Sequence, residues 1–369
     1  MFIIKKIIKS IFRYLSYGLF RLIYGKIKSK VTNTEHFLET KNVKFEKNIV
    51  YKIFIVKNSR LYTDRINDTA IIHNNHIVDG PSFQLRQSVD VDSSFNIVFS
   101  KGTPRVKKKI DGVLFSLLTG GGGNSNYWHW LFDVLPRLNI LNQFKDIAEE
   151  IDYYLFPSLD RKFQKETLDI MNIPFNKRLS SKNFRHIDSK KIIVSSHPYT
   201  LLNDPNLDSL QIPIWISDYL KKIFLKDRFL NKSSNDLPSK VFINRKDGTT
   251  KKWRYIINES DVESNLEKKG FKSLTLENYS FLDQVNIFYN AKEVVGLHGA
   301  GFANIVFCKP NTKILELRSN SAGDMFKNLA ISNKLIYNDI SLDPKTINYN
   351  NQAGDIEIDI NLLNSILKI

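Results

Sequence analysis

The order of hydrophobic and polar positions divides this chain of 369 residues into three stretches of different character. In residues 1–30, apolar side chains recur at the helical period. Short β-rich runs then alternate with turn-forming residues, which predicts strands at Ile49–Val56, Ala70–Val78 and Phe95–Phe99. Beyond Lys109, strand-like and helix-like runs alternate, and this alternation predicts a parallel sheet with crossover helices.

The alternating stretch forms two groups of elements on either side of the polar segment Asn231–Ser239, which we predict to be a linker. The first group contains strands Val113–Leu118, Tyr153–Phe156 and Lys191–Ser195, a helix starting near Asn126 and a helix Arg161–Met171. The second group contains strands Lys240–Asn244, Phe271–Leu276, Glu293–Leu297 and Lys313–Leu317 and helices Ser260–Lys269, Ser280–Asn290 and Ala300–Phe307. We therefore expect an α/β protein with a segment 1–30, a domain 31–235 and a domain 236–369.

The first thirty residues have the composition of an amphipathic helix that lies in a membrane interface. Eight basic residues precede the first acid, Glu35, and supply half of the formal net charge of +16. On a helical projection, Lys5, Lys6, Lys9, Arg13 and Ser16 share one side, and Ile4, Ile8, Ile11, Phe12, Leu15, Leu19 and Leu22 lie mostly on the other. The longest uncharged run, Tyr14–Phe20, is too short to span a bilayer, and the features of a secretory signal are missing. We predict peripheral attachment to the cytoplasmic face of the inner (plasma) membrane; the alternative is a helix docked on the protein's own core.

Composition and charge narrow the classes of protein further. Hydrophobic residues make up 42% of the chain and aromatic residues 12%, which is enough for large cores and excludes a disordered chain. The positive excess outside the first thirty residues suits a phosphate-bearing substrate, and no nucleic-acid-binding motif accompanies it, so nucleic acid is not an expected partner. Cys308 is the sole cysteine, which excludes an intramolecular disulfide and agrees with a reducing compartment.

The first stretch with candidate chemistry is Asn126–Leu138, NYWHWLFDVLPRL. His129 and Asp133 are four residues apart and share one face of a helix, and the aromatic residues around them supply apolar walls. An acid beside an imidazole in such walls can act as a general base. The preceding Gly120–Gly123 would allow a ligand to approach the backbone, and Pro136 should kink or end the helix. The alternative is a buried His–Asp hydrogen bond that only holds the helix in place.

The second stretch is Phe242–Glu259, FINRKDGTTKKWRYIINE. Arg245 follows a predicted strand, at the end where open α/β sheets bind ligands. Further cations follow it: Lys246, Lys251, Lys252 and Arg254. Guanidinium groups suit a diphosphate because each holds two oxygens and neutralises their charge. The alternative is a solvated basic loop.

The third stretch is Val294–Leu317, VVGLHGAGFANIVFCKPNTKILEL. A turn after the strand carries His298, and a helix start near Ala300 would offer free backbone amides to an anion. The glycines that would let a phosphate approach are Gly296, Gly299 and Gly301. Glu316, at the end of the next predicted strand, is placed to accept ribose hydroxyls. Because the spacing is not G-x-G-x-x-G, the glycine pattern alone is a weak signal.

In this order and spacing, the three stretches resemble glycosyltransferase family 61 over residues 110–320. The resemblance implies a GT-B-like fold, in which two Rossmann-like domains face a central cleft, and a metal-independent, inverting transfer without a cofactor. It implies a nucleotide-sugar donor, UDP-linked, and an enzyme that is a hexosyl-, N-acetylhexosaminyl- or pentosyltransferase. Bacterial relatives are commonly linked to capsular or other surface polysaccharide synthesis, so the expected second substrate is a glycan or a lipid-linked acceptor.

The resemblance also implies roles for individual residues. On the donor side these are Arg245, Arg254, Asn258, Glu259, His298, Gly299, Ala300, Gly301, Asn304 and Glu316. On the acceptor side they are Asn126, Tyr127, Trp128 and Arg137. The sequence departs from the family pattern at Tyr255, which follows Arg254 at a position where a second arginine is frequent in the family. This difference concerns how the phosphates are bound.

Inversion requires a base for the acceptor hydroxyl and a stabilised leaving group. We expect Asp133 to be the base, with His129 orienting it or exchanging roles with it. Arg245, Arg254 and the helix start at Gly299–Gly301 would stabilise the departing diphosphate.

Other classes of protein fit the sequence less well. Asp90 and Asp92 form an Asp-Val-Asp triplet of the kind that holds Mn²⁺ or Mg²⁺ in metal-dependent transferases, but it lies outside the three stretches. A non-catalytic glycan-binding or scaffold protein that retains the fold is the main alternative, although the candidate base and phosphate groups are all present. The missing G-x-G-x-x-G and G-x-S-x-G motifs argue against a dinucleotide oxidoreductase and a serine hydrolase.

Overall fold

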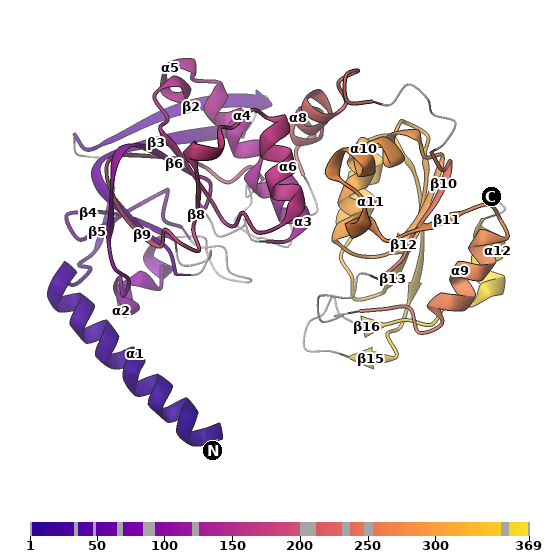
Figure 1. The fold of residues 1–369 in the computed structure, drawn as a ribbon, viewed down its shortest axis with the longest axis horizontal. Helices are drawn as coiled ribbons and strands as arrows, with labels where there is room; N and C mark the ends of the chain where they lie inside the picture. Colours follow the sequence, from indigo (N-terminus) through magenta and orange to yellow (C-terminus); the bar gives the residue numbers. More distant parts are fainter. Residues whose placement is uncertain are drawn as a thin grey trace. The chain divides into compact units, whose positions relative to one another are not determined.

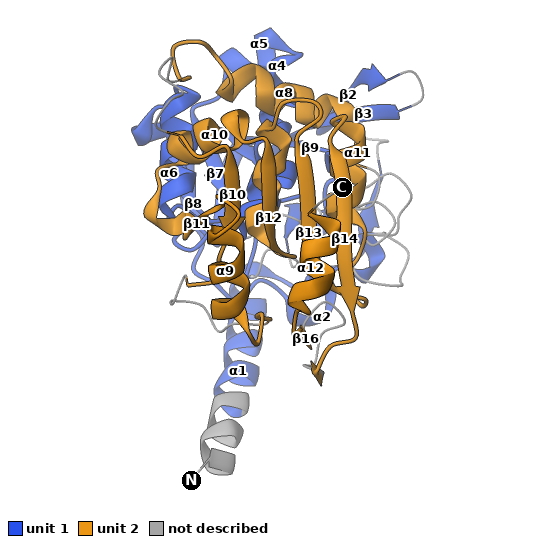
Figure 2. Ribbon diagram, turned by 90° about the vertical axis from the view of Figure 1, so that its right-hand side faces the viewer, with its two compact units in different colours: residues 1–208 blue, residues 209–369 orange. Residues whose placement is uncertain are grey.

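The computed structural model describes residues 2–32, 36–46, 49–64, 69–83, 93–119, 125–199, 212–230, 237–246, 254–347 and 354–367, with side chains from residue 11 onward. It divides into two compact units, Met1–Asp208 (unit 1) and Ser209–Ile369 (unit 2), which Figure 2 colours separately. Both units combine sheets with helices, so the expected mixed α/β class is confirmed. The domain boundary at residue 235 stays a prediction, and residues 231–236 of the expected linker lie outside the described residues.

Unit 1 is built on a nine-stranded sheet with the order β1-β5-β4-β3-β9-β6-β7-β8, and β2 pairs with β3. The strands are β1 (Lys30–Val31), β2 (Leu38–Glu46), β3 (Ile49–Tyr62), β4 (Ala70–His73), β5 (His76–Val78), β6 (Lys108–Ser116), β7 (Tyr153–Phe156), β8 (Arg178–Ser180) and β9 (His186–Ser195). The helices are α1 (Phe2–Tyr24), α2 (Val98–Lys101), α3 (Tyr127–His129), α4 (Pro136–Asn142), α5 (Lys145–Glu149) and α6 (Lys162–Ile170), with a π-helical turn η3 (Trp130–Val134) and 3₁₀ turns η2 (Ser93–Phe95) and η4 (Phe175–Lys177).

The β-rich part of unit 1 follows the sequence pattern with one exception. The predicted run Ala70–Val78 is the hairpin β4–β5, whose turn uses positive φ angles at Asn74 and Asn75, as Asn tolerates. The strand predicted at Phe95–Phe99 is wrong, because α2 begins at Val98. The side chain of Asn96 accepts a hydrogen bond from the Val98 amide at 3.1 Å, and this local bond favours a helical turn.

The other part of the sheet is the parallel group β9-β6-β7-β8. Strand β3 pairs with β9 in the antiparallel sense and joins the two parts. One apolar cluster runs through both parts, from Phe54 and Val56 on β3 to Leu114 on β6 and Leu155 on β7. Pro136, which was expected to kink or end the helix, lies at a boundary between two helical elements, since the wider turn η3 ends at Val134 and α4 starts at Pro136.

Unit 2 is built on a five-stranded parallel sheet with the order β11-β10-β12-β13-β14. Its strands are β10 (Lys240–Ile243), β11 (Lys272–Leu274), β12 (Glu293–Leu297), β13 (Lys313–Ser319) and β14 (Ile336–Leu342), and a separate pair is β15 (Thr346–Ile347) with β16 (Gly354–Asp355). The helices are α8 (Ile214–Phe224), α9 (Glu259–Glu267), α10 (Phe281–Asn290), α11 (Met325–Ser332) and α12 (Ile360–Ile366), with 3₁₀ elements η6 (Leu276–Asn278) and η7 (Ala300–Phe307). Figure 1 shows α10 and α11 on one face of the sheet and α9 and α12 on the other.

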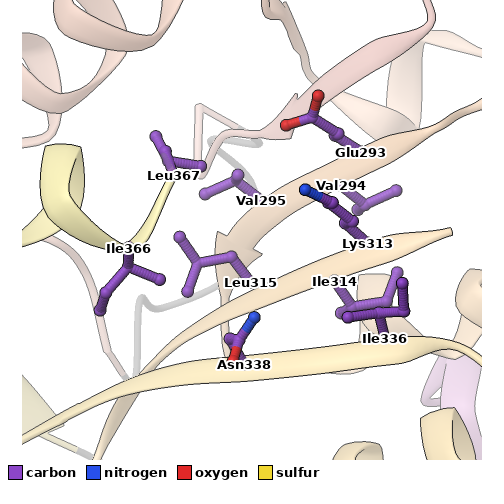
Figure 3. A pocket seen from close by; sticks show the side chains of 10 residues that line it. All are labelled: Glu293, Val294, Val295, Lys313, Ile314, Leu315, Ile336, Asn338, Ile366 and Leu367. Carbon is purple, nitrogen blue, oxygen red and sulfur yellow. The ribbon is translucent and has the colours of Figure 1, made fainter. Parts of the chain in front are cut away.

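A pocket lies at the amino ends of three strands of unit 2 (Figure 3). Glu293, Lys313 and Ile336, which begin β12, β13 and β14, line it together with Ile366 and Leu367 from the end of α12. Ligands of open parallel sheets bind at the opposite, carboxyl ends of the strands. The pocket is therefore separate from the candidate site of unit 2.

The first helix, α1, was expected from the sequence pattern and spans Phe2–Tyr24. Within the described part of the chain, no helix combines the length and the apolar character needed to cross a membrane.

Candidate functional site

The candidate site of unit 1 lies where the order of the parallel strands reverses. From β6 the chain moves outward to β7 and β8 and then returns to β9 on the other side of β6. In open α/β sheets, the carboxyl ends of the strands at such a reversal form the ligand crevice. Thr119 and the α3–η3–α4 segment follow β6, and His197 and Tyr199 follow β9.

The helical segment that carries the candidate base starts at a side-chain cap. Asn126, expected on the acceptor side, accepts a hydrogen bond from the Trp128 amide at 2.8 Å. Trp128 stacks on Phe132 with 4.2 Å between ring centroids, and Tyr127 packs edge-on against Phe163. These aromatic contacts fix the helical face on which His129 and Asp133 lie.

His129 and Asp133 form a hydrogen-bonded pair, with 2.5 Å between Nδ1 and Oδ2. The Asp133 side chain is fully buried, whereas 35% of the His129 side chain is exposed. Burial alone would lower the pKa of His129, but the charge of Asp133 and the hydrogen bond to it outweigh burial and raise the pKa. Since Nδ1 is engaged by the buried acid, Nε2 is the ring nitrogen left for a substrate.

Arg137 supplies the positive charge next to this pair. Its Nε donates to the backbone carbonyl of Asp133 at 2.8 Å, and its Nη2 donates to the Thr119 carbonyl at 2.5 Å. The guanidinium is fully buried, and burial lowers its pKa to about 10 against the opposing charge of Asp133. Arg137 therefore ties the end of β6 to the helical segment from inside the fold.

Two further residues of this site, His197 and Tyr199, lie outside the three stretches that the sequence pattern indicates. His197 and Tyr199 are buried, and their rings meet edge to face at 4.7 Å. Burial, together with the charges of Arg137 and His129, lowers the pKa of His197 well below the ordinary value. Burial and the charge of Asp133 raise the pKa of Tyr199. The available signal was their place directly after the predicted strand that ends at Ser195.

Unit 2 has its own reversal of strand order, between β10 and β12. The carboxyl end of β10 carries Arg245, and that of β12 carries His298 and the start of η7. Gly296 allows these two strands to pack closely, because a Cβ there would lie 2.9 Å from Cβ of Ile243 and 3.2 Å from its carbonyl oxygen. A Cβ on Gly299 would lie 3.0 Å from Nη1 of Arg245, so the guanidinium reaches the turn that leads into η7.

His298 belongs to a buried chain of hydrogen bonds across three strands. Its Nδ1 bonds to Oε1 of Glu316 on β13. The other carboxylate oxygen of Glu316 accepts a hydrogen bond from the hydroxyl of Tyr337 on β14 at 2.5 Å. Burial and the charge of Glu316 raise the pKa of Tyr337. Both oxygens of Glu316 are thus engaged within the sheet, and its expected contact with a ribose stays a prediction.

Two arginines of unit 2 lie close enough to repel each other. Burial and the charge of Arg245 lower the pKa of Arg254 to about 10, and the charge of Glu316 opposes the shift. Within the described part of the chain, Nη1 of Arg254 is buried and has no hydrogen-bond partner. Two neighbouring guanidinium groups with an unused donor form a cationic site that an anion with several oxygens would neutralise.

The chain is similar to one known family of proteins. The family model described as Glycosyltransferase 61 matches residues 127–315, which is more than half of the chain. This chain belongs to glycosyltransferase family 61. No curated protein matches it in sequence.

Three residues of this family 61 member that were predicted to bind the sugar donor form hydrogen bonds within the protein itself. The amide of Asn258 bonds in both directions with the backbone of Ile358, at 2.9 Å each. Glu259 accepts a hydrogen bond from the Arg245 amide at 2.7 Å and so fixes the backbone that carries this guanidinium. Asn304 is fully buried and donates to Oε1 of Gln284 at 3.0 Å. These contacts place all three residues in support of the site, and their contact with a donor stays a prediction.

Several candidates are not placed by the structure. Gly120–Gly123, Lys251, Lys252, Asp90 and Asp92 lie outside the described residues. Lys246 is described and forms an ion pair with Glu263, with 2.6 Å between Nζ and Oε2. In the described ranges, no group of three or more His, Cys, Asp or Glu side chains could hold a metal ion.

Proposed function

We propose that this family 61 member transfers a hexosyl, N-acetylhexosaminyl or pentosyl group from a UDP-sugar, with inversion and without a metal ion. The observation that supports the donor most directly is the pair Arg245 and Arg254 beside His298, at the carboxyl edge of a parallel sheet. A diphosphate would remove the repulsion between the two guanidinium groups and use the buried Nη1 of Arg254.

We propose His129 as the general base and Asp133 as the residue that positions it, which reverses the order of roles expected first. Nε2 of His129 takes the proton of the acceptor hydroxyl as that oxygen bonds to the anomeric carbon of the sugar. The bond from this carbon to the diphosphate oxygen breaks, and its electron pair leaves with the diphosphate. Arg245 and Arg254 stabilise the charge that develops there, which is electrostatic catalysis that needs no metal. The arrangement we propose for the two units is GT-B-like.

The pathway that we propose is synthesis of a capsular or other surface polysaccharide, with a glycan or lipid-linked acceptor. Attachment of residues 1–30 to the cytoplasmic face of the membrane would place the enzyme beside lipid-linked acceptors. Among the side chains of α1 that the structure describes, seven large hydrophobic ones are exposed, which supports this attachment: Ile11, Phe12, Tyr14, Leu15, Leu19, Leu22 and Ile23.

Substitutions in the two units test the transferase proposal. Release of UDP from a panel of UDP-sugars gives turnover, and calorimetry with UDP gives affinity. His129→Gln should lower turnover by about 10²–10⁴-fold, the usual contribution of a positioned base, and leave UDP affinity unchanged. Arg245→Ala should weaken UDP binding, whereas Lys246→Gln, a neighbouring cation paired with Glu263, should not. UDP binding that survives Arg245→Ala, or normal turnover in His129→Gln, would contradict the assignment.

Deletion of residues 1–30 tests the membrane proposal. The deleted residues carry eight cations and the apolar side chains of α1, so the shortened protein should move from the membrane fraction to the supernatant on centrifugation. A shortened protein that still sediments with membranes would exclude these residues as the anchor.

A further inference from the structure

Glu316 is a buried acid near the cations of unit 2 that we propose to bind the diphosphate. It lies on β13 next to Leu317, which belongs to the same apolar cluster as Ile256. Ile256 follows Arg254 by two residues, so this cluster brings the arginine to the same region of the sheet. Burial and the charge of Arg245 lower the pKa of Arg254 to about 10, and the charge of Glu316 opposes this shift. The carboxylate therefore attracts the guanidinium of Arg254.

A carboxylate and a guanidinium that are both buried would ordinarily pair directly. Two N–H groups of an arginine match the two oxygens of the acid, and the pair offsets part of the cost of burying both charges. Here both oxygens of Glu316 have other partners, since Oε1 bonds to Nδ1 of His298 and Oε2 accepts a hydrogen bond from Tyr337 at 2.5 Å. Within the described part of the chain, the buried Nη1 of Arg254 has no hydrogen-bond partner. Glu316 thus attracts Arg254 without using its donor.

Tyr337 reaches Glu316 from β14, the edge strand of the sheet (Figure 2). Glu316 pairs with Asp339 in the parallel register of β13 and β14, so Tyr337, two residues before Asp339, lies on the same face of the sheet. Asp339 itself accepts a hydrogen bond from Nε of Arg318 at 2.6 Å. Burial and the charge of Glu316 raise the pKa of Tyr337, so its hydroxyl stays protonated and can donate.

His298, the partner of the other oxygen of Glu316, is held from two further sides. Its amide donates to the carbonyl of Leu317 at 2.8 Å, and its ring packs edge-on against Phe326 at 4.9 Å. Since the histidine is fixed in this way, the hydrogen bond from Tyr337 is the remaining contact that sets the orientation of the carboxylate.

We propose that Tyr337 is a positioning residue for donor binding, because its hydroxyl holds Oε2 of Glu316 and prevents this carboxylate from pairing with Arg254. Nη1 of Arg254 is then kept for the diphosphate of the nucleotide sugar. The inference rests on the proposed donor site, and it gives Glu316 an internal role in place of the ribose contact that was expected for it.

Calorimetry with UDP on the full chain tests this inference. Tyr337→Phe removes the hydroxyl and keeps the ring, so Oε2 of Glu316 is released and can pair with Arg254. UDP must then displace a charge-assisted hydrogen bond, and its affinity should fall roughly tenfold or more. The control Tyr289→Phe removes a hydroxyl near the end of α10, which leads into the amino end of β12, and should leave UDP affinity unchanged.

Substitution of Glu316 separates a competing carboxylate from a lost contact with the nucleotide. Glu316→Gln removes a negative charge near the phosphates, so this variant should bind UDP more tightly, by roughly threefold or more. In Tyr337→Phe/Glu316→Gln no carboxylate remains to pair with Arg254, so this double variant should bind UDP at least as tightly as the unchanged chain. A Tyr337 that touches the nucleotide, or that only supports the fold, predicts a double variant as weak as Tyr337→Phe.

Circular dichroism establishes that each variant is folded. The inference is overturned by normal affinity in Tyr337→Phe, by a double variant that stays weak, or by equal or weaker binding in Glu316→Gln. The single variant Glu316→Gln decides the matter if Tyr337→Phe does not fold. Arg245→Ala in the same experiment reports on the donor site itself: normal UDP binding there overturns the donor proposal and the role of Tyr337 together. If Arg245→Ala loses binding and Tyr337→Phe does not, the role of Tyr337 alone is overturned.

Discussion

At the scale of single residues, each unit contains a histidine hydrogen-bonded to a buried carboxylate, but the two histidines differ in their exposure to solvent. His129 and His298 each bond through Nδ1 to a buried carboxylate, Asp133 in unit 1 and Glu316 in unit 2. The side chain of His298 is only 3% exposed, whereas that of His129 is 35% exposed. A histidine with one ring nitrogen hydrogen-bonded and the other accessible to a substrate is suited to proton transfer. A histidine that is buried on all sides is suited to a structural role.

The pH dependence of the reaction should report on His129. A base must be unprotonated to act, so kcat/KM should rise with pH through an inflection above the ordinary histidine value of about 6.5. In Asp133→Asn the charge that raises the pKa of His129 is gone, so the remaining activity should have its inflection at lower pH. The measurement is a pH series of initial rates for both proteins. An unshifted inflection in Asp133→Asn would show that another group controls the profile.

At the scale of elements, local signals in the sequence predicted several strands and helices correctly. Strand β7 and strand β12 have the predicted ends, because both are short apolar runs between turn signals. The helical spacing of His129 and Asp133 was also correct, since four residues place side chains on one face. The strand predicted at Phe95–Phe99 is wrong because a local hydrogen bond from the Val98 amide to the Asn96 side chain favours a helical turn over the β propensity of the neighbouring residues.

Close packing between elements predicts that alanine substitutions at two glycines will change the free energy of unfolding by different amounts. Gly296→Ala would push a methyl group against Ile243 on β10 and should destabilise the protein by about 1–3 kcal/mol, as overpacking does. Gly323→Ala is the matched control, because a Cβ there meets nothing within 4 Å. It should be neutral or slightly stabilising, by up to about 1 kcal/mol. Urea unfolding followed by circular dichroism measures both, and equal midpoints would contradict the packing argument.

At the scale of the whole molecule, each unit carries a complete reversal of strand order with its own polar cluster. The cluster of unit 1 contains the proposed base, and that of unit 2 contains the proposed phosphate ligands. Binding of UDP and removal of the acceptor proton are therefore expected to depend on different units.

This division predicts that unit 2 alone retains donor binding. A fragment of residues 209–369 contains all five parallel strands together with Arg245, Arg254 and His298. It should bind UDP within roughly threefold of the full chain, a difference of about 0.7 kcal/mol or less. Calorimetry on the fragment and on the same fragment with Arg245→Ala measures this. A fragment that is folded by circular dichroism but does not bind UDP would assign part of the nucleotide site to unit 1.

The sequence by itself determined the α/β class, many of the strands and helices, and the three stretches on which family membership rests, because periodicity and turn signals act over a few residues. It did not determine which distant residues meet. His197 and Tyr199 reach the surroundings of Asp133 through the pairing of β9 with β6, and Tyr337 reaches Glu316 through the pairing of β14 with β13.

The tertiary structure also decided which polar side chains are buried, which are exposed and which have hydrogen-bond partners within the protein. Burial distinguishes the partly exposed His129 from the buried Asp133. Hydrogen bonding distinguishes the guanidinium of Arg254, which has an unused donor, from the paired amide of Asn258. Such differences depend on surfaces that come together only when the sheet is assembled, and a local pattern of hydrophobic and polar residues does not encode them.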